Sequence, residues 1–168
     1  MKKLLLAAMM IIAFTMNAQE GSGNEPTAKG NYVIEANTGS GTAGFTSFSL
    51  NTVDGNTTWS AGLDGGYFAM KNLAIKAGLG YNYNSNLADS YNYKLGAEYY
   101  INGNIPVGAD FTGTFSENAS TNWVGLQAGY AYFIAKNVSI KPAVRYNIGL
   151  EKEQNNSLQG LIGFSIFL

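Results

Sequence analysis

The chain contains no cysteine and no histidine among its 168 residues. The lack of cysteine excludes disulfides, thiolate metal sites and a lipid-bearing N-terminal cysteine. The lack of histidine removes the commonest general base and the commonest metal ligand. We therefore expect no catalytic residues, no metal site and no cofactor, and a protein that is not an enzyme.

Charge is also scarce. Charged residues make up 12% of the chain, about half the usual share for a soluble domain. The net charge of −1 gives no reason to expect a nucleic-acid partner. Hydrophobic residues make up 46%, with 21 glycines and 11 tyrosines, and the length favours a single domain.

The N-terminus has the pattern of a secretory signal peptide. Lys2 and Lys3 precede an uncharged apolar run over 4–14, which is too short to span a membrane comfortably. Small and polar residues follow, so we expect cleavage after Ala18; the alternative is an N-terminal membrane anchor. The boundaries we expect are a cleaved signal peptide over 1–18, a disordered tail over 19–29 and the folded domain over 30–168.

A repeated hairpin pattern organises the rest of the chain. The segment 67–76 recurs as 132–141, with a looser copy at 99–107; each has an aromatic pair, a short polar turn and an apolar alternation. From Tyr32 onward the dominant period is two, and no segment has a convincing helical period. The pattern predicts an all-β fold of eight antiparallel up-and-down strands, joined by three short turns on one side and four longer loops on the other.

One stretch near the start of the domain is less regular. Residues 39–44 match G-x-G-x-x-G, but a dinucleotide loop requires a helix next, and an alternating Ser/Thr-rich segment follows instead. We interpret 39–44 as a loop or a kink. The segment 45–52 either extends the first strand or lies in the first long loop.

Three features decide which face of the barrel is inside. The polar face carries many glycines rather than Lys and Glu, as expected for a narrow, crowded lumen. The apolar face carries no charged residue on any predicted strand, and its aromatic residues gather at two heights. A soluble barrel would place the apolar face inside, so these features favour a transmembrane barrel with the short turns on the periplasmic side. The residues predicted to form the two aromatic girdles are Trp59, Tyr67, Tyr81, Tyr93, Tyr99, Phe111, Tyr132 and Tyr146.

Charged residues on the polar face are then predicted to fill the lumen. An eight-stranded barrel is just wide enough for side chains to fill, and buried charges must be paired. A neutral, salt-bridged plug is therefore favoured over a proton or ion path. The predicted network is Glu35, Asp64, Lys76, Lys94, Glu98, Asp110, Lys141 and Arg145.

The repeats also suggest which charges pair. If the first aromatic of each repeat lies opposite the first apolar residue after the turn, Asp64 lies opposite Lys76 and Lys94 lies opposite Asp110. Both hairpins would then join opposite charges at cross-strand distance.

The third hairpin leaves more room. The same geometry places Arg145 and Lys141 opposite glycines, Gly125 and Gly129. We expect these two long side chains to cross the lumen and reach Glu98 and Glu35.

The signal sequence, the repeated Tyr-Phe-x-x-Lys-Asn hairpins and the alternating final strand together resemble the small eight-stranded outer-membrane barrels of the OmpA/OmpX-like type. The resemblance covers the whole mature chain. In that family the C-terminal strand is read by the barrel-assembly machinery and usually ends in an aromatic; here Phe167 is penultimate and Leu168 is last. Small outer-membrane enzymes similar to this scaffold use His, which this chain lacks.

The resemblance implies a location and partners. We expect a monomer in the outer membrane of a Gram-negative bacterium, surrounded by outer-membrane lipid, with an unknown extracellular partner at the loops as a further expectation. Its role would be envelope integrity or surface interaction. The alternatives are a narrow porin-like channel for small solutes and a soluble secreted ligand-binding barrel.

Overall fold

The computed structural model describes residues 25–39, 44–45, 47–85, 88–116 and 120–168. The predicted signal peptide lies outside the described residues. No helix long and apolar enough to cross a membrane occurs within these ranges. The strands are β1 (Tyr32–Asn37), β2 (Phe48–Val53), β3 (Asn56–Met70), β4 (Leu73–Asn84), β5 (Ser90–Ile101), β6 (Ile105–Ser116), β7 (Ser120–Gly129), β8 (Tyr132–Ala135), β9 (Val138–Gly149) and β10 (Ser157–Phe167).

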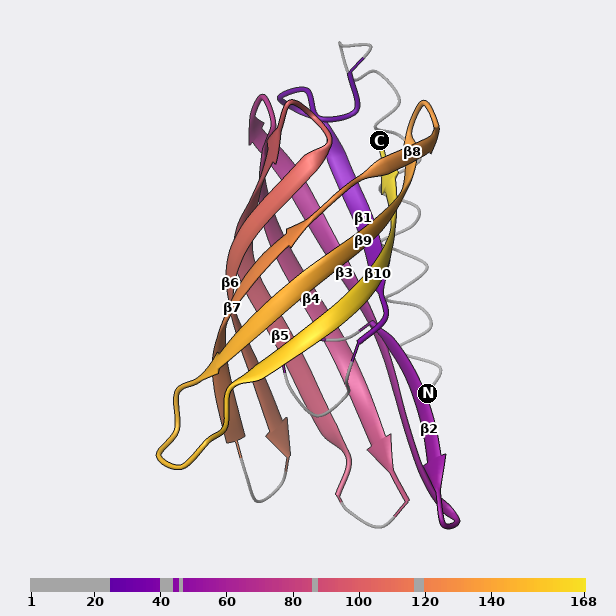
Figure 1. The fold of residues 1–168 in the computed structure, drawn as a ribbon, viewed down its shortest axis with the longest axis vertical. Helices are drawn as coiled ribbons and strands as arrows, with labels where there is room; N and C mark the ends of the chain where they lie inside the picture. Colours follow the sequence, from indigo (N-terminus) through magenta and orange to yellow (C-terminus); the bar gives the residue numbers. More distant parts are fainter. Residues whose placement is uncertain (1–24, 40–43, 46, 86–87, 117–119) are drawn as a thin grey trace.

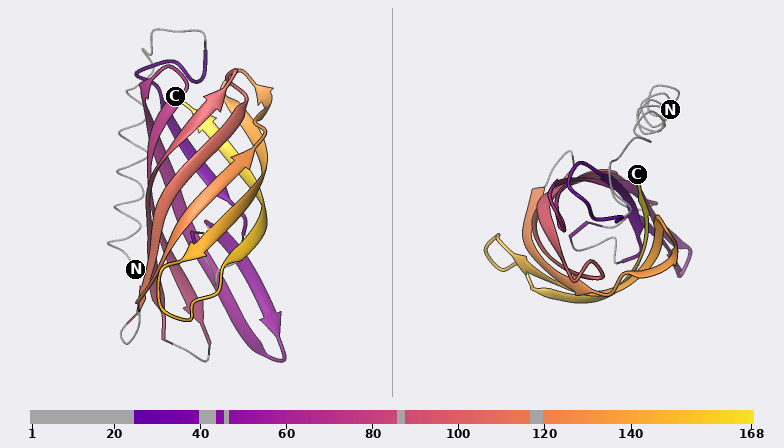
Figure 2. Two further views of the ribbon diagram at one scale, coloured as in Figure 1. Left: turned by 60° about the vertical axis from the view of Figure 1, so that its left-hand side comes forward. Right: turned by 90° about the horizontal axis from the view of Figure 1, so that it is seen from above.

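The strands close into an antiparallel barrel (Figure 1; Figure 2, right). β1 completes the ring because it pairs with β10 on one side and with β3 on the other. We call each full-length segment of the wall a stave. The ten strands make eight staves, because β2 continues the stave of β1 and β8 continues the stave of β7. The predicted eight-stranded up-and-down barrel is therefore confirmed.

A proline interrupts the stave of β7 and β8. Tyr130 donates its backbone N–H to the carbonyl of Pro142 on β9 at 3.0 Å, but Pro142 has no N–H to return. The N–H of Ala131 bonds instead to the carbonyl of Asn104 at 2.7 Å. The ladder resumes at Tyr132, so the break between the two strands is local.

Ten residues are looped out of the first stave. Glu35 of β1 pairs with Asp64 of β3, so an unbroken ladder would pair Thr38 with Ala61. Phe48 pairs with Ala61 instead, ten positions later in the chain. We call the ten extra residues between β1 and β2, 38–47, the looped-out segment; 40–43 and 46 lie outside the described residues, and Thr38 and Ser47 at its two ends still bond to Ile162 and Gly62.

The sequence explains why the chain loops out at this place. In the observed register Phe48 and Leu50 point outward and are exposed. In the unbroken register Thr38 and Ser40 would occupy those outward positions, between apolar neighbours. Residues 48–52 thus extend the first stave, whereas Phe45 belongs to the looped-out segment.

Alternation along each stave separates two faces of opposite polarity. Outward apolar side chains are uncovered; Leu79 and Leu158 retain 74% and 70% of their accessible surface. Inward charged side chains such as Asp64 and Lys141 are buried. The apolar face of the sequence is therefore the outer face of the barrel.

Part of the predicted disordered tail is ordered. Residues 25–29 form turns beside the β3–β4 hairpin, at the top of Figure 1. Thr27 is buried, its carbonyl accepts from the N–H of Asn72 at 2.8 Å, and Lys71 forms an ion pair with Glu25 at 2.8 Å. The prediction of disorder was wrong for 25–29 because these polar residues have specific partners on the inner turn; residues 19–24 lie outside the described part.

Candidate functional site

The lumen is the candidate site, because it collects the charges of the strands. Six staves contribute the eight predicted side chains: Glu35 from β1, Asp64 from β3, Lys76 from β4, Lys94 and Glu98 from β5, Asp110 from β6, and Lys141 and Arg145 from β9. All eight side chains are almost fully removed from solvent; Asp110, the most accessible, retains 6%. Four acids and four bases leave the interior neutral.

Lys76 is the centre of the larger cluster. Its ammonium nitrogen lies 3.2 Å from a Glu35 oxygen, 3.3 Å from an Asp64 oxygen and 3.5 Å from a Glu98 oxygen. The three carboxylates come from three different staves, β1, β3 and β5. Together with its own stave, β4, this one lysine therefore links four of the eight staves through the interior of the barrel.

Two further lysines complete this cluster. Lys141 from β9 bonds to both oxygens of Glu98, at 2.9 and 3.0 Å, and forms an ion pair with Glu35. Lys94 donates to Asp64. Three lysines and three carboxylates thus form one connected, neutral network that spans the lumen.

Arg145 and Asp110 form a separate pair. Two parallel bonds join them, Nη1 to Oδ2 and Nη2 to Oδ1, each 2.6 Å long. The Nε–H of Arg145 donates to Asn147 Oδ1 at 2.7 Å. This bidentate geometry is the strong form of an arginine–carboxylate contact.

The predicted cross-strand register was wrong by two residues in all three hairpins. In the first, Tyr67 lies opposite Ile75 rather than Leu73, because the turn is centred on Lys71 and Asn72 and a bulge follows Phe68. Asn72 adopts a left-handed conformation with φ of 67°, which closes this tight turn. Since the error is an even number of residues, every side chain keeps its predicted face.

The shift changes which charges meet. Lys94 and Asp110, predicted to face each other, lie opposite Thr112 and Gly96 and bind other partners. Asp64 lies opposite Gly78 rather than Lys76, although its carboxylate still reaches Lys76 along a diagonal.

The third hairpin shows the same shift. Arg145 lies opposite Gln127 rather than Gly125, and Gly129 lies opposite Ala143 rather than Lys141. Lys141 does reach Glu98 and Glu35 across the lumen. Arg145 was expected to reach the same acids and instead binds Asp110.

Glycines opposite the charges provide the space for them. A Cβ on Gly96 would lie 2.3 Å from the Cβ of Asp110, and one on Gly125 would lie 2.0 Å from Nη2 of Arg145. No side chain fits at either position without displacing a charge. The glycine-rich inner face is therefore the counterpart of the buried charges.

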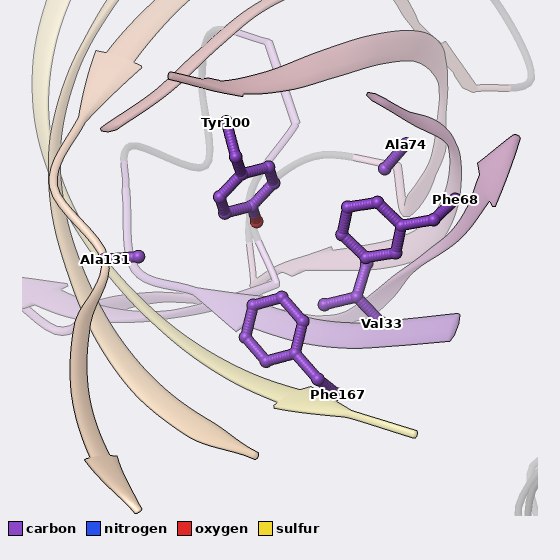
Figure 3. Packing of buried hydrophobic residues seen from close by; sticks show 6 residues of the cluster. All are labelled: Val33, Phe68, Ala74, Tyr100, Ala131 and Phe167. Atoms are coloured by element: carbon purple, nitrogen blue, oxygen red, sulfur yellow. The ribbon is translucent and has the colours of Figure 1, made fainter. Parts of the chain in front are cut away.

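An aromatic cluster closes the end of the lumen beside the short turns, which we call the inner end (Figure 3). The rings of Phe68 and Tyr100 lie 5.7 Å apart, and the ring of Phe167 lies 6.2 Å from Phe68 and 6.0 Å from Tyr100. Phe133 packs against Phe167 at 5.3 Å. We call Val33, Phe68, Ala74, Tyr100, Ala131, Phe133 and Phe167 the inner cap.

The inner cap could have been predicted from the sequence by applying the strict alternation of side chains along a strand. Each repeat carries two adjacent aromatics, and neighbouring residues on a strand point to opposite faces. Tyr67, Tyr99 and Tyr132 are exposed on the outside, while the residues that follow the first two, Phe68 and Tyr100, are buried inside. Only the first aromatic of each pair was identified from the sequence, as a girdle residue, and the second was not identified as part of the inner cap.

The looped-out segment contributes a second closure, farther toward the loops. The ring of Phe45 is buried and lies 5.6 Å from the Lys94 ammonium nitrogen. A Cβ on Gly78 would lie 2.9 Å from Cζ of Phe45, and one on Gly62 would lie 3.4 Å from it. Phe45 therefore sits in a socket made by two glycines of the wall, on the side of the charge network that faces the longer loops.

One small cavity lies within the charge network. A cavity of about 10 Å³ lies among Lys76, Lys94, Glu98, Asp110 and Gln127, which is about the volume that one water molecule needs. Within the described ranges, no group of three or more acidic side chains is arranged to hold a metal ion.

The predicted girdle residues all lie on the outer face. Tyr67, Tyr99 and Tyr132 are beside the short turns, and the other five lie toward the loop end: Trp59, Tyr81, Tyr93, Phe111 and Tyr146. Three further aromatics, Tyr83, Tyr91 and Phe115, join the second group through ring contacts.

Comparison with known proteins supports the fold. No protein-family model and no curated protein sequence matches the chain. Among solved structures, the N-terminal β-barrel domain of Pseudomonas aeruginosa OprF superimposes with a TM-score of 0.57 at 16% identity, over 83% of this chain and 98% of that domain. OprG of Pseudomonas aeruginosa (TM-score 0.45, 14% identity, 86% of this chain and 99% of that one) and Ail of Yersinia pestis (0.44, 13%, 83% and 99%) are also similar.

At this level of identity the likeness to OprF concerns the fold, and it agrees with the resemblance read from the repeats. The closed antiparallel ring of the structure is the arrangement that the repeats predicted. The chain has the fold of the small eight-stranded outer-membrane β-barrels.

Proposed function

We propose that the chain is a non-enzymatic integral β-barrel of a Gram-negative outer membrane, reached by export through a cleaved signal peptide. The observation that carries this proposal is the inverted polarity of the barrel. Large apolar side chains are exposed around the outside, whereas all eight charged residues of the staves named above are inside. Such an exterior is stable against hydrocarbon and would aggregate in water.

The closed lumen supports a structural role over passage of solutes. From the inner end, a solute would meet the inner cap, then the two ion-pair groups, then Phe45 in its glycine socket. The charges between the closures compensate one another, so the interior offers no unbalanced charge to attract an ion. We infer a role in envelope integrity or in surface contact through the outer loops.

Assembly and surroundings follow from the same proposal. Outer-membrane lipid would surround the apolar exterior, with the predicted girdles at its two boundaries. The barrel-assembly machinery would read β10, in which Phe167 belongs to the inner cap and the exposed Phe164 faces outward. The protein would act as a monomer, and any extracellular partner would bind at the loops.

Membrane fractionation combined with heat-modifiable gel mobility tests the membrane assignment. We expect the mature protein in the outer-membrane fraction, with different mobility before and after boiling. Recovery from the aqueous periplasm without detergent would instead favour the soluble ligand-binding barrel.

Planar-bilayer recording tests the closed lumen separately. We expect no steady openings from the purified protein. Steady openings on the nanosiemens scale would replace the closed barrel with the narrow porin-like channel while leaving the membrane assignment intact.

A further inference from the structure

The outer half of the first stave has one unpaired edge. β2 pairs with β3 along its whole length, and no ladder joins β2 to β10, although β1, the inner half of the same stave, does pair with β10. Figure 1 shows β2 diverging from β10 toward the loop end. Both strands lie entirely within the described residues. We call the side of residues 48–53 that faces away from β3 the free edge of β2.

The hydrogen-bond pattern shows which backbone groups point to the free edge. Gly62 of β3 donates its N–H to the carbonyl of Ser47 at 2.7 Å. Because bonded and non-bonded pairs alternate along an antiparallel ladder, the odd-numbered residues of β2 bond to β3. The N–H and C=O groups of its even-numbered residues therefore point away from β3.

The unpaired backbone begins at the predicted outer lipid boundary. Leu50 pairs with Trp59, a predicted girdle residue. Deeper in the wall, Phe48 is still held by a bridge to Thr38, so Leu50 and Thr52 are the residues whose backbone groups have no partner strand on this side. Unpaired backbone is very costly in hydrocarbon but not at an aqueous surface. The free edge thus lies where a strand can reach it from outside the membrane.

The free edge lacks the devices by which sheets protect their edges. Residues 48–53 include no charged residue, no proline and no glycine. Five of the six are exposed, with Leu50 at 67% and Val53 at 58%. Such an edge is a template for a further strand.

The hairpin that presents the edge is already ordered. The hydroxyl oxygens of Ser49 and Ser60 lie 2.7 Å apart, and those of Thr52 and Thr57 lie 3.2 Å apart, so side-chain bonds reinforce the backbone ladder on both faces. A docking strand would therefore not need to order the hairpin, which lowers the cost of binding.

A second copy of the chain does not match this edge. Copies inserted the same way into one membrane have parallel β2 strands, and a two-fold axis along the membrane normal sets identical residues at equal height. A parallel ladder requires instead that the residues pointing toward each other be offset by one position. In a symmetric pair the even-numbered residues of both strands would face one another, so no regular ladder forms.

The edge defines the chemistry of the partner that it fits. Backbone N–H and C=O groups are matched by an extended peptide, and antiparallel pairing is the more stable arrangement. The one charged residue of the hairpin segment 48–58 is Asp54, at its tip. In an antiparallel pair this carboxylate lies beside the N-terminal end of the added strand, where a basic residue would be complementary.

We propose that the free edge of β2 docks an extended strand of an extracellular protein by antiparallel sheet extension. The docked strand is uncharged along its length and carries Lys or Arg at its N-terminal end. The inference rests on the proposed outer-membrane location, because the loop end must face the outside of the cell. It adds a place and a mode of binding to the proposed surface contact.

Amide hydrogen exchange, followed by NMR in nanodiscs, measures the edge residue by residue. In the free protein we expect the N–H groups of Leu50 and Thr52 to exchange at least about tenfold faster than those of Ser49 and Asn51, which bond to β3. The probe is the peptide acetyl-Lys-Thr-Val-Thr-Val-Thr-amide. Saturating peptide should slow exchange at Leu50 and Thr52 by about tenfold or more and leave Ser49 and Asn51 unchanged.

A proline variant removes one donor of the edge without touching the ladder to β3. Leu50→Pro deletes an N–H that points to the free edge, and proline is tolerated on edge strands. We expect the affinity for the peptide to fall about tenfold, which corresponds to about 1.4 kcal/mol. Leu50→Val is the matched control and should bind as the parent does. If heat-modifiable mobility shows that Leu50→Pro is unfolded, Thr52→Pro, nearer the tip, replaces it.

Three results would overturn the inference. Slow exchange at Leu50 and Thr52 in the free protein would mean that the edge is already paired. Millimolar peptide that leaves these two amides unprotected would remove the docking site, and protection of Leu158 and Gly160 instead would move it to β10. Failure of the parent protein to insert into membranes would contradict the proposed location, so the two failures are distinguishable.

Discussion

The bidentate pair of Arg145 and Asp110 allows a sharp test of how the lumen is built. Arg145→Met would leave the Asp110 carboxylate in the interior without its two 2.6 Å bonds. Arg145 and Asp110 side chains retain 1% and 6% exposure, so bulk solvent does not compensate the lost partner. Removing one member of a buried pair costs about 3–5 kcal/mol, and we expect this loss in the free energy of unfolding.

The double variant decides whether the loss belongs to the pair. Asp110→Asn alone should also destabilise, but adding it to Arg145→Met removes the unpaired charge. We expect the double variant to lose at least about 2 kcal/mol less than the sum of the two single losses. Urea unfolding in lipid vesicles, followed by tryptophan fluorescence, measures all three values.

A second cycle serves as the control. The register predicted from the sequence placed Lys94 opposite Asp110, whereas its observed partner is Asp64. Lys94→Met combined with Asp110→Asn should therefore show a much smaller coupling energy than Arg145→Met combined with Asp110→Asn. Additivity for Arg145 and Asp110 together with strong coupling for Lys94 and Asp110 would refute the observed register.

Three further predictions concern the two closures and the exterior. Gly78→Ala should cost about 1–3 kcal/mol by pushing on the Phe45 ring, and much of this cost should disappear in a Phe45→Leu background; an equal cost there would contradict the socket. Phe167→Ala should cost about 3–5 kcal/mol by emptying the inner cap, measured as the urea midpoint, and a wild-type midpoint would count against that packing. Leu63→Lys, midway between the two girdles, should destabilise the barrel in vesicles by about 2–4 kcal/mol, while Thr52→Lys on the exposed hairpin should not; equal effects would contradict a lipid-facing exterior.

The period of two in the sequence was sufficient for the staves and for their faces. Lys76 and Leu79 are three positions apart, which places them on opposite faces whatever the register, because the pleat alternates strictly. The same argument assigns Phe68 inward once Tyr67 is outward.

Pairing inside the lumen depends on features that local sequence does not contain. In the first hairpin the two-residue register error came from the bulge after Phe68 and from the turn at Asn72, whose left-handed backbone is a local choice among several turns. Contacts such as Lys141 with Glu35 join staves that are not neighbours in the ladder. They depend on the tilt and stagger of the closed barrel, which the repeat pattern leaves open.

The looped-out segment was the least predictable part. Its glycines and hydroxyl residues predicted a loop, but the same composition would suit an extracellular loop. Only the pairing of Phe48 with Ala61 shows that the chain returns to the same stave. Phe45 is the single large apolar residue of 39–47, and its isolation among small residues is the signal that could have identified it.

The lysine-centred network has a consequence for how the barrel forms. Glu35 is on the first stave and Lys141 is on the seventh, so their contact exists only when the two ends of the chain have met. In a sheet that still lacks β1, the Glu35 carboxylate is absent, so the charges of Lys76 and Lys141 are not fully compensated. This imbalance would arise in an interior from which water is being excluded. Intermediates that are nearly closed are thus penalised, and closure of the ring neutralises the interior in one step. We expect the final joining of β1 to β10 to be highly cooperative, with the buried charges acting as a checkpoint against barrels that stop one stave short.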